Sequence, residues 1–196
     1  MTTAEQTQTT PLTLDAFMQL GAQYDRAEYI NGEWIEKMPT VMIHSWIVRL
    51  LFRMLDRFCS AGQLGEVFSE TTFAMSEPPH WVLGSRIPDI MFYEAARWAV
   101  FVSITPDWLH KPILIIPALV VEVVSSNDSY SDLRAKVQLY LRDGVQIVWV
   151  VDPTKRQIDV YEAERLTVLE LGDTLSGGTL LPGFALPLVE VFGTVM

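Results

Sequence analysis

The sequence predicts an α/β fold of the mixed α+β kind, with a mixed central sheet flanked by helices. The first observation behind this prediction is the run of residues 113–124, which is apolar at odd and even positions alike except for one carboxylate. Such a run is typical of a strand buried on both faces of a sheet that helices cover. The second is the order of the expected elements, in which two strands, a helix and two more strands follow one another. That order implies a mixed sheet with at least one helical crossover.

The N-terminal part predicts two helices with a hairpin between them. Residues 13–20 predict a short helix, with Thr13 placed to cap it. Residues 28–35 predict two short strands around an Asn-Gly turn. Apolar residues recur at helical spacing over residues 42–60, which predicts a long helix.

The rest of the chain alternates strands with one further helix. We expect strands over residues 66–74 and 86–93, the second with Pro88 near its start, where a missing backbone donor is tolerated. Residues 95–112 give no clear prediction. The elements expected after them are a strand at 118–124, a helix at 131–142 that Gly144 caps, a strand at 145–151, a turn at 152–155, and strands at 157–162 and 166–171. The apolar tail, residues 181–192, is expected to pack back on the body.

Composition bounds the architecture and the surroundings of the protein. With 196 residues and 49% apolar content, the chain can form one domain, expected over residues 12–196. Residues 1–11 are polar and predict a disordered tail, without the apolar segment of a signal peptide. No apolar run approaches the ~20 residues that span a bilayer, so no membrane partner is expected. The single cysteine, Cys59, is compatible with a reducing, cytoplasmic location.

The formal net charge of -10 counts against binding of nucleic acid by bulk electrostatics, because neutralising phosphates needs Lys or Arg. Local patches and bound divalent cations set the field at a site, so the charge does not exclude a nuclease. Arg49, Arg53 and Arg57 recur every four residues on the expected helix 42–60 and form a basic stripe. The stripe is either a solvated face, which is the commoner case, or a row that follows a phosphate backbone.

Three charged residues stand at positions where apolar side chains are expected. Glu122 interrupts the apolar run, Asp89 follows Pro88 among apolar neighbours, and Lys136 shares a helical face with apolar residues. Buried charges are rarely tolerated unless they are paired or coordinate a metal. Two carboxylates on adjacent strands would form a hard oxygen site for Mg²⁺ or Mn²⁺, and a nearby ammonium could orient a water. The equally weighted alternative is a structural Lys136–Glu122 ion pair with Asp89 capping a loop.

The order of these motifs resembles the PD-(D/E)XK nuclease superfamily and, more narrowly, the Uma-type restriction endonuclease family. The matching segments are residues 28–33, His44, residues 87–89, residues 119–125, residues 136–140, residues 144–145, residues 148–153 and residues 181–184. The resemblance covers roughly residues 12–193 and rests on the order and spacing of motifs that are individually weak.

The resemblance implies a restriction-endonuclease-like core, a DNA substrate and, because both strands are cut, a homodimer. By this analogy Asp89 and Glu122 hold Mg²⁺ or Mn²⁺, with the backbone carbonyl of Val123 as a third ligand. The superfamily usually has its lysine two residues after the acidic residue, where this chain has Val124, and Lys136 would replace it. Glu28 and His44 match further family positions that line the site. Taken alone, His44 is more typical of a capping or boundary residue.

Three functions fit these residues. A metal-dependent DNA endonuclease requires Asp89, Glu122 and Lys136 to converge. A nuclease-like domain that has lost its activity, and serves as a nucleic-acid-binding or assembly module, is favoured by the acidic charge and by Val124. A metal-free hydrolase that uses the two carboxylates as an acid/base pair ranks last, because it gives Lys136 no role.

Overall fold

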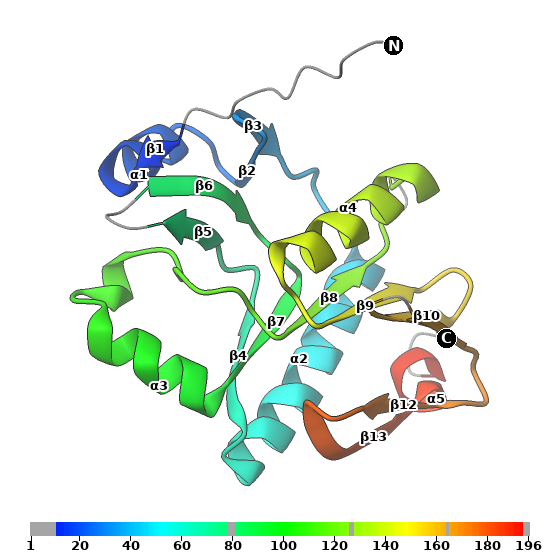
Figure 1. Ribbon diagram of the computed structural model, residues 1–196. Helices are drawn as coiled ribbons and strands as arrows, with labels where there is room; N and C mark the ends of the chain where they lie inside the picture. Colours follow the sequence, from blue (N-terminus) through cyan, green and yellow to red (C-terminus); the bar gives the residue numbers. More distant parts are fainter. Residues whose placement is uncertain (1–10, 78–80, 126–127, 164, 194–196) are drawn as a thin grey trace, which may run out of the picture.

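The computed structural model describes residues 11–77, 81–125, 128–163 and 165–193. The predicted polar tail, residues 1–11, lies outside the described residues apart from Pro11. At the centre is a six-stranded sheet with the order β11-β10-β9-β8-β7-β4 (Figure 1). Its strands are β4 (Gly65–Ser69), β7 (Ile90–Glu94), β8 (Leu119–Val123), β9 (Ile147–Asp152), β10 (Gln157–Glu162) and β11 (Arg165–Leu169).

The sheet is mixed, as the sequence predicts. Strands β8 and β9 pair in parallel, and the other neighbours pair antiparallel. The parallel pair is joined through helix α4 (Tyr130–Asp143), which ends at Gly144 with φ 106°, a conformation that favours glycine. The helical crossover and the glycine cap are therefore confirmed.

Strand β8 is buried on both faces. Its odd-numbered residues pack in one core with helix α2 (Met42–Gly62), whereas Val120 packs with α4 residues Val137 and Tyr140 in a second core. Because side chains alternate along a strand, Glu122 points to the same face as Val120, toward α4. The carboxylate therefore lies under a helix and not at a solvent-exposed edge.

The N-terminal part of the chain contributes to a second, three-stranded sheet with the order β1-β6-β5. Strand β1 (Leu12–Thr13) pairs with β6 (Trp81–Arg86), which pairs with β5 (Phe73–Glu77), and helix α1 (Leu14–Gly21) follows β1. The Thr13 hydroxyl accepts the Ala16 N–H, so the predicted N-cap is confirmed. The hairpin of β2 (Ala27–Ile30) and β3 (Glu33–Glu36) turns at Asn31 and Gly32, both with positive φ.

Two predicted strands are wrong in the same way, since each spans a junction between sheets. The segment 66–74 divides into β4 and β5, and Glu70 between them has φ 49°. The segment 86–93 divides into β6 and β7, with Pro88 in the link. Proline lacks an N–H and cannot continue a hydrogen-bonded ladder. Asp89 consequently lies at the bend just before β7 and not within a strand.

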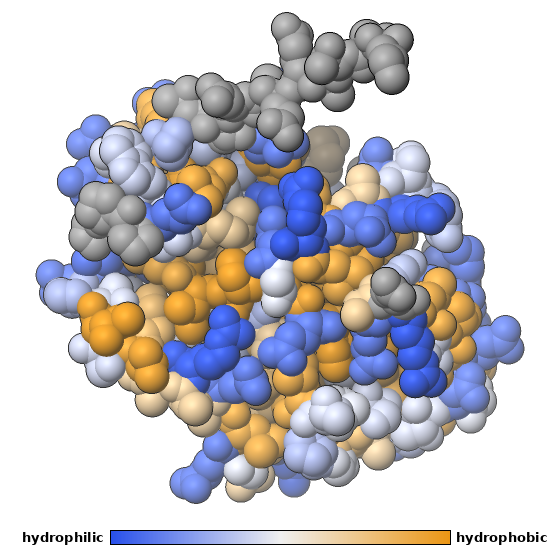
Figure 2. Space-filling model, viewed as in Figure 1, coloured by the Kyte–Doolittle hydropathy of each residue, from blue (hydrophilic) through white to orange (hydrophobic). Residues whose placement is uncertain are grey.

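The remaining elements lie at the edges. Residues 95–112, which gave no clear prediction, contain helix α3 (Ala95–Ile104) and a 3-10 turn η1 (Trp108–His110). Apolar surface is exposed over α3 (Figure 2). The C-terminal tail forms β12 (Thr174–Gly177), β13 (Leu181–Pro187) and α5 (Leu188–Phe192). Its buried apolar side chains join the core under α2, so the prediction that the tail packs on the body is confirmed. No helix in the described part of the chain is long and apolar enough to cross a membrane.

Candidate active site

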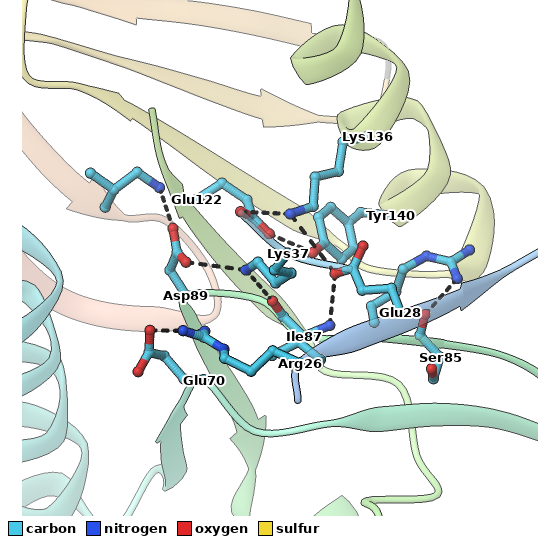
Figure 3. A network of polar contacts seen from close by, with 12 residues as sticks. Arg26, Glu28, Lys37, Glu70, Ser85, Ile87, Asp89, Glu122, Lys136 and Tyr140 are labelled. Atoms are coloured by element: carbon cyan, nitrogen blue, oxygen red, sulfur yellow. Dashed lines mark hydrogen bonds and ion pairs between the residues drawn. The ribbon is translucent and has the colours of Figure 1, made fainter. Parts of the chain in front are cut away.

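A cavity of about 560 Å³ opens between the β2–β3 hairpin, the start of α2, the end of β8 and helix α4. Five residues that the sequence singles out line it together with a sixth that it did not: Glu28, His44, Asp89, Glu122, Lys136 and, newly, Lys37. Figure 3 shows five of these side chains, all except His44, converging from separate elements. The predicted convergence of the two carboxylates and the lysine is therefore present in the geometry.

Glu122 is held by two residues of α4. Its Oε1 accepts a hydrogen bond from the Tyr140 hydroxyl, and its Oε2 lies 2.9 Å from Lys136 Nζ (Figure 3). Glu122 is only 5% exposed. Burial raises the pKa of Glu122; Lys136 opposes this increase and the nearby Asp89 carboxylate adds to it. Both oxygens thus have partners, but the environment still disfavours the negative charge.

Asp89 is held by one backbone donor and two side chains, which come from three segments of the chain. Its Oδ2 accepts the Val123 N–H at 2.8 Å and lies 3.0 Å from His44 Nε2, while its Oδ1 lies 3.4 Å from Lys37 Nζ. Burial alone would raise the pKa of Asp89, but the His44 hydrogen bond and the Lys37 charge hold it well below the usual range. Asp89 is therefore ionised at neutral pH.

His44 contributes through this contact and not as a helix cap. It is the third residue of α2 and is buried, with its Nε2 directed at Asp89. Its Nδ1 is buried without a hydrogen-bond partner in the described residues. The structure therefore places His44 at the start of the helix, as a boundary residue, but with its contact to Asp89 and not as a cap.

Lys136 bridges two carboxylates. Its Nζ lies 2.9 Å from Glu122 Oε2 and 3.9 Å from Glu28 Oε1, and its side chain is 23% exposed. Burial would lower the pKa of Lys136, but Glu122 and Glu28 together raise it above its ordinary value. Glu28 Oε1 also accepts the Ile87 N–H at 2.8 Å, which ties the hairpin to the link that carries Asp89. Lys136 is consequently a fixed ammonium.

Lys37 was missed by sequence reasoning. It follows β3 directly, donates to the Ile87 carbonyl at 2.7 Å and faces Asp89. A signal for it does exist in the hairpin. The two-residue turn pairs Glu28 with Ile35, and the next pair on the same face is Arg26 with Lys37, whose N–H donates to the Arg26 carbonyl. Lys37 therefore shares a hairpin face with Glu28, which the sequence analysis had already selected.

The donor set fits a hard divalent cation by its chemistry. Carboxylate oxygens of Asp89 and Glu122 and the end of β8 at Val123 line one cavity, and Mg²⁺ prefers such oxygen ligands. The three buried carboxylates, Glu28 included, outnumber the two ammonium groups. In the described residues no group of three His, Cys, Asp or Glu side chains lies close enough to form a ready-made metal site. The ammonium groups of Lys37 and Lys136 lie between the carboxylates of the cavity.

The arginine stripe lies elsewhere. Arg49, Arg53 and Arg57 are exposed on α2 and line a separate cavity of about 740 Å³ between that helix and β13. None of the three lines the cavity that contains Asp89. Arg49 stacks on Trp46, with its guanidinium carbon 5.5 Å from the ring centroid. The structure thus does not bring the stripe into the carboxylate cavity.

The fold places the chain in the class of restriction-endonuclease-like α/β proteins. The chain belongs to the Uma2 family, described as "Putative restriction endonuclease", whose model matches residues 14–189. A crystal structure of a protein from Anabaena variabilis, described as a "putative nuclease belonging to DUF820", is similar over 95% of this chain and 100% of that chain. Its TM-score is 0.75 at 20% sequence identity, which supports the fold. No curated protein matches the chain.

Proposed function

We propose that the protein is a metal-dependent endonuclease that hydrolyses phosphodiester bonds in DNA. Membership of the Uma2 family supports a nuclease. The observation that carries the proposal is that the Lys136 ammonium lies 2.9 Å from Glu122, in the same cavity as Asp89. Two carboxylates and a charged lysine around one cavity are the groups that such hydrolysis needs.

Each residue has a role in this proposal. Asp89 and Glu122 would hold Mg²⁺ or Mn²⁺, joined by the carbonyl of Val123. The cation, when bound, polarises the scissile phosphodiester. Lys136, kept protonated by its two carboxylate neighbours, orients the attacking water and offsets the negative charge that develops on the phosphate.

Other residues act by holding these groups. His44 and the Val123 N–H fix Asp89 Oδ2, and Tyr140 fixes Glu122 Oε1. Fixed carboxylates need little reorganisation when charge develops, which is how preorganised sites stabilise a transition state.

Val124 is the main argument for the alternative, a nuclease-like binding or assembly module without activity. Its side chain packs with the apolar cluster under α4 and supplies no charge. The position of Lys136 favours the active enzyme, because its ammonium reaches the carboxylate from the helix. A metal-free acid/base hydrolase gains no support, since it leaves this fixed ammonium without a function.

DNA would contact the protein beyond the cavity. We propose the exposed row of Arg49, Arg53 and Arg57 as the phosphate-contacting surface, since a row of cations on an acidic protein supplies the local charge that binding requires. We further propose a homodimer, as the family resemblance implies, because two copies of the site would let the enzyme cut both strands of DNA.

Cleavage of supercoiled plasmid tests the proposal. The wild type should nick or linearise plasmid in Mg²⁺ or Mn²⁺ and not in EDTA, and Glu122→Gln should lose this activity while keeping its fold by circular dichroism. Plasmid that stays intact with the wild type in both metals would favour the inactive module. Cleavage that persists in EDTA would favour the metal-free hydrolase.

A further inference from the structure

Charges of opposite sign alternate through the cavity. Lys136 lies between Glu122 and Glu28, and Lys37 lies beside Asp89 (Figure 3). The two ammonium groups come from different elements, Lys136 from α4 and Lys37 from the segment that follows β3. Glu122 and Glu28 therefore share the cation of Lys136, whereas Asp89 has Lys37 beside it.

Lys37 and the other partners of Asp89 use different oxygens. The Val123 N–H and His44 Nε2 both engage Oδ2, at 2.8 Å and 3.0 Å. Oδ1 contacts Lys37 at 3.4 Å and has no other polar partner among the described residues. Asp89 is thus oriented without Lys37, and Lys37 stands at the one oxygen that remains open to a ligand.

The stronger contact of Lys37 is elsewhere. Its Nζ donates to the Ile87 carbonyl at 2.7 Å, which is a short charge-assisted hydrogen bond, whereas 3.4 Å to Oδ1 is a long contact. The side chain is 16% exposed and lines the cavity, so it borders open space. The ammonium could leave Oδ1 and still keep its bond to Ile87.

We propose that Lys37 is the resident counter-ion of Asp89 and competes with a divalent cation for Asp89 Oδ1. The inference rests on the proposed function, because it assumes that Asp89 is a cation ligand. Two positive charges a few ångströms apart repel strongly in a partly buried cavity. Lys37 therefore weakens cation binding and limits loading of the site to conditions in which the cation is plentiful.

Calorimetric titration of MgCl₂ into the full chain tests this. Lys37→Met keeps most of the apolar stem of the side chain and removes the charge, so it should bind Mg²⁺ about tenfold more tightly than the wild type, or better. Lys155→Met is the matched control, because Lys155 pairs with Asp152 at 3.1 Å outside the cavity. It should bind Mg²⁺ as the wild type does.

A second variant separates charge from folding. Lys37→Gln retains a donor for the Ile87 carbonyl without the charge, and it should also bind Mg²⁺ more tightly than the wild type. It takes the place of Lys37→Met in the test if that variant does not fold. If the wild type binds Mg²⁺ through Asp89 and the folded Lys37 variants bind it no more tightly, the inference about Lys37 is overturned. The proposed function would then still stand. Absence of Mg²⁺ binding in the wild type and in every variant would overturn both the inference and the proposed function.

Discussion

Lys136 Nζ on α4 lies 2.9 Å from Glu122 Oε2 on β8, and the connection between the two elements explains the contact. Helix α4 is the crossover between the parallel strands β8 and β9, so it must run back over the face to which Glu122 points. A lysine on the inner side of this helix therefore meets a carboxylate near the end of β8. In the proposed function, Lys136 would supply from the helix the cation that the PD-(D/E)XK superfamily, which the sequence resembles, usually has at the position of Val124.

Breaking this pair should destabilise the protein. Lys136→Met leaves Glu122 buried without its cation, which should lower the free energy of unfolding by on the order of 3 kcal/mol. The double variant Lys136→Met/Glu122→Gln removes both charges and should recover part of that loss. Urea denaturation of the two single variants and the double variant measures the coupling. Strictly additive losses would show that the contact has no energetic weight.

Tyr140→Phe should cost about 1–3 kcal/mol, because a buried carboxylate oxygen loses its donor. The change should also raise the pKa of Glu122 further, since the hydroxyl stabilises the ionised form. Thermal denaturation and the pH titration of Glu122 by NMR give the two values. Tyr24→Phe is the control, because the Tyr24 ring stacks on Trp34 away from the cavity. Equal stability of both variants would contradict the assigned role of Tyr140.

The Asp89 network should make stability depend on pH in a defined direction. The pKa of Asp89 is lowered by folding, so the stability it contributes is present above its ordinary pKa of 3.8 and is lost as pH falls below that value. The advantage of the wild type over Asp89→Asn should therefore shrink by up to about 1.4 kcal/mol per pH unit below pH 4. Urea denaturation of both proteins at pH 6 and pH 3 measures it. An advantage that is constant between the two pH values would argue against the lowered pKa.

The arginine row should affect DNA binding and leave the cavity unchanged. Replacing Arg49, Arg53 and Arg57 together by Glu should weaken DNA affinity at least tenfold and flatten its dependence on salt, because fewer phosphates are neutralised. Affinity for Mg²⁺ should stay as in the wild type. Arg97→Glu/Arg142→Glu/Arg165→Glu, at three exposed positions on other elements, changes the net charge by the same amount and is the control. Equal loss in the control would show that the row is only a solvated face.

The convergence of Asp89, Glu122 and Lys136 could be predicted from the sequence more closely than the bounds of the strands around them. Glu122 and Lys136 could be selected because a charge among apolar residues is a strong local signal, and the helical crossover brings them together. The two wrongly predicted strands, residues 66–74 and 86–93, consist largely of residues that are common in strands. Only the folded structure shows that each segment passes from one sheet to another. Lys37 lies at the end of a hairpin, where a charged residue is common and does not stand out from its neighbours. Only the register of that hairpin, which places Lys37 on the same face as Glu28, could have indicated that it belongs to the site.

Titration of Mg²⁺ into the wild type and into Asp89→Asn, followed by calorimetry, tests the central claim most directly. Asp89→Asn keeps the size of the side chain and removes the charge of one of the two proposed ligands, and circular dichroism checks that the variant is folded. We expect one Mg²⁺ per wild-type chain and a loss of affinity of at least tenfold in Asp89→Asn. Mg²⁺ binding of equal strength in the two proteins would contradict the assignment of Asp89 and Glu122 as the metal site.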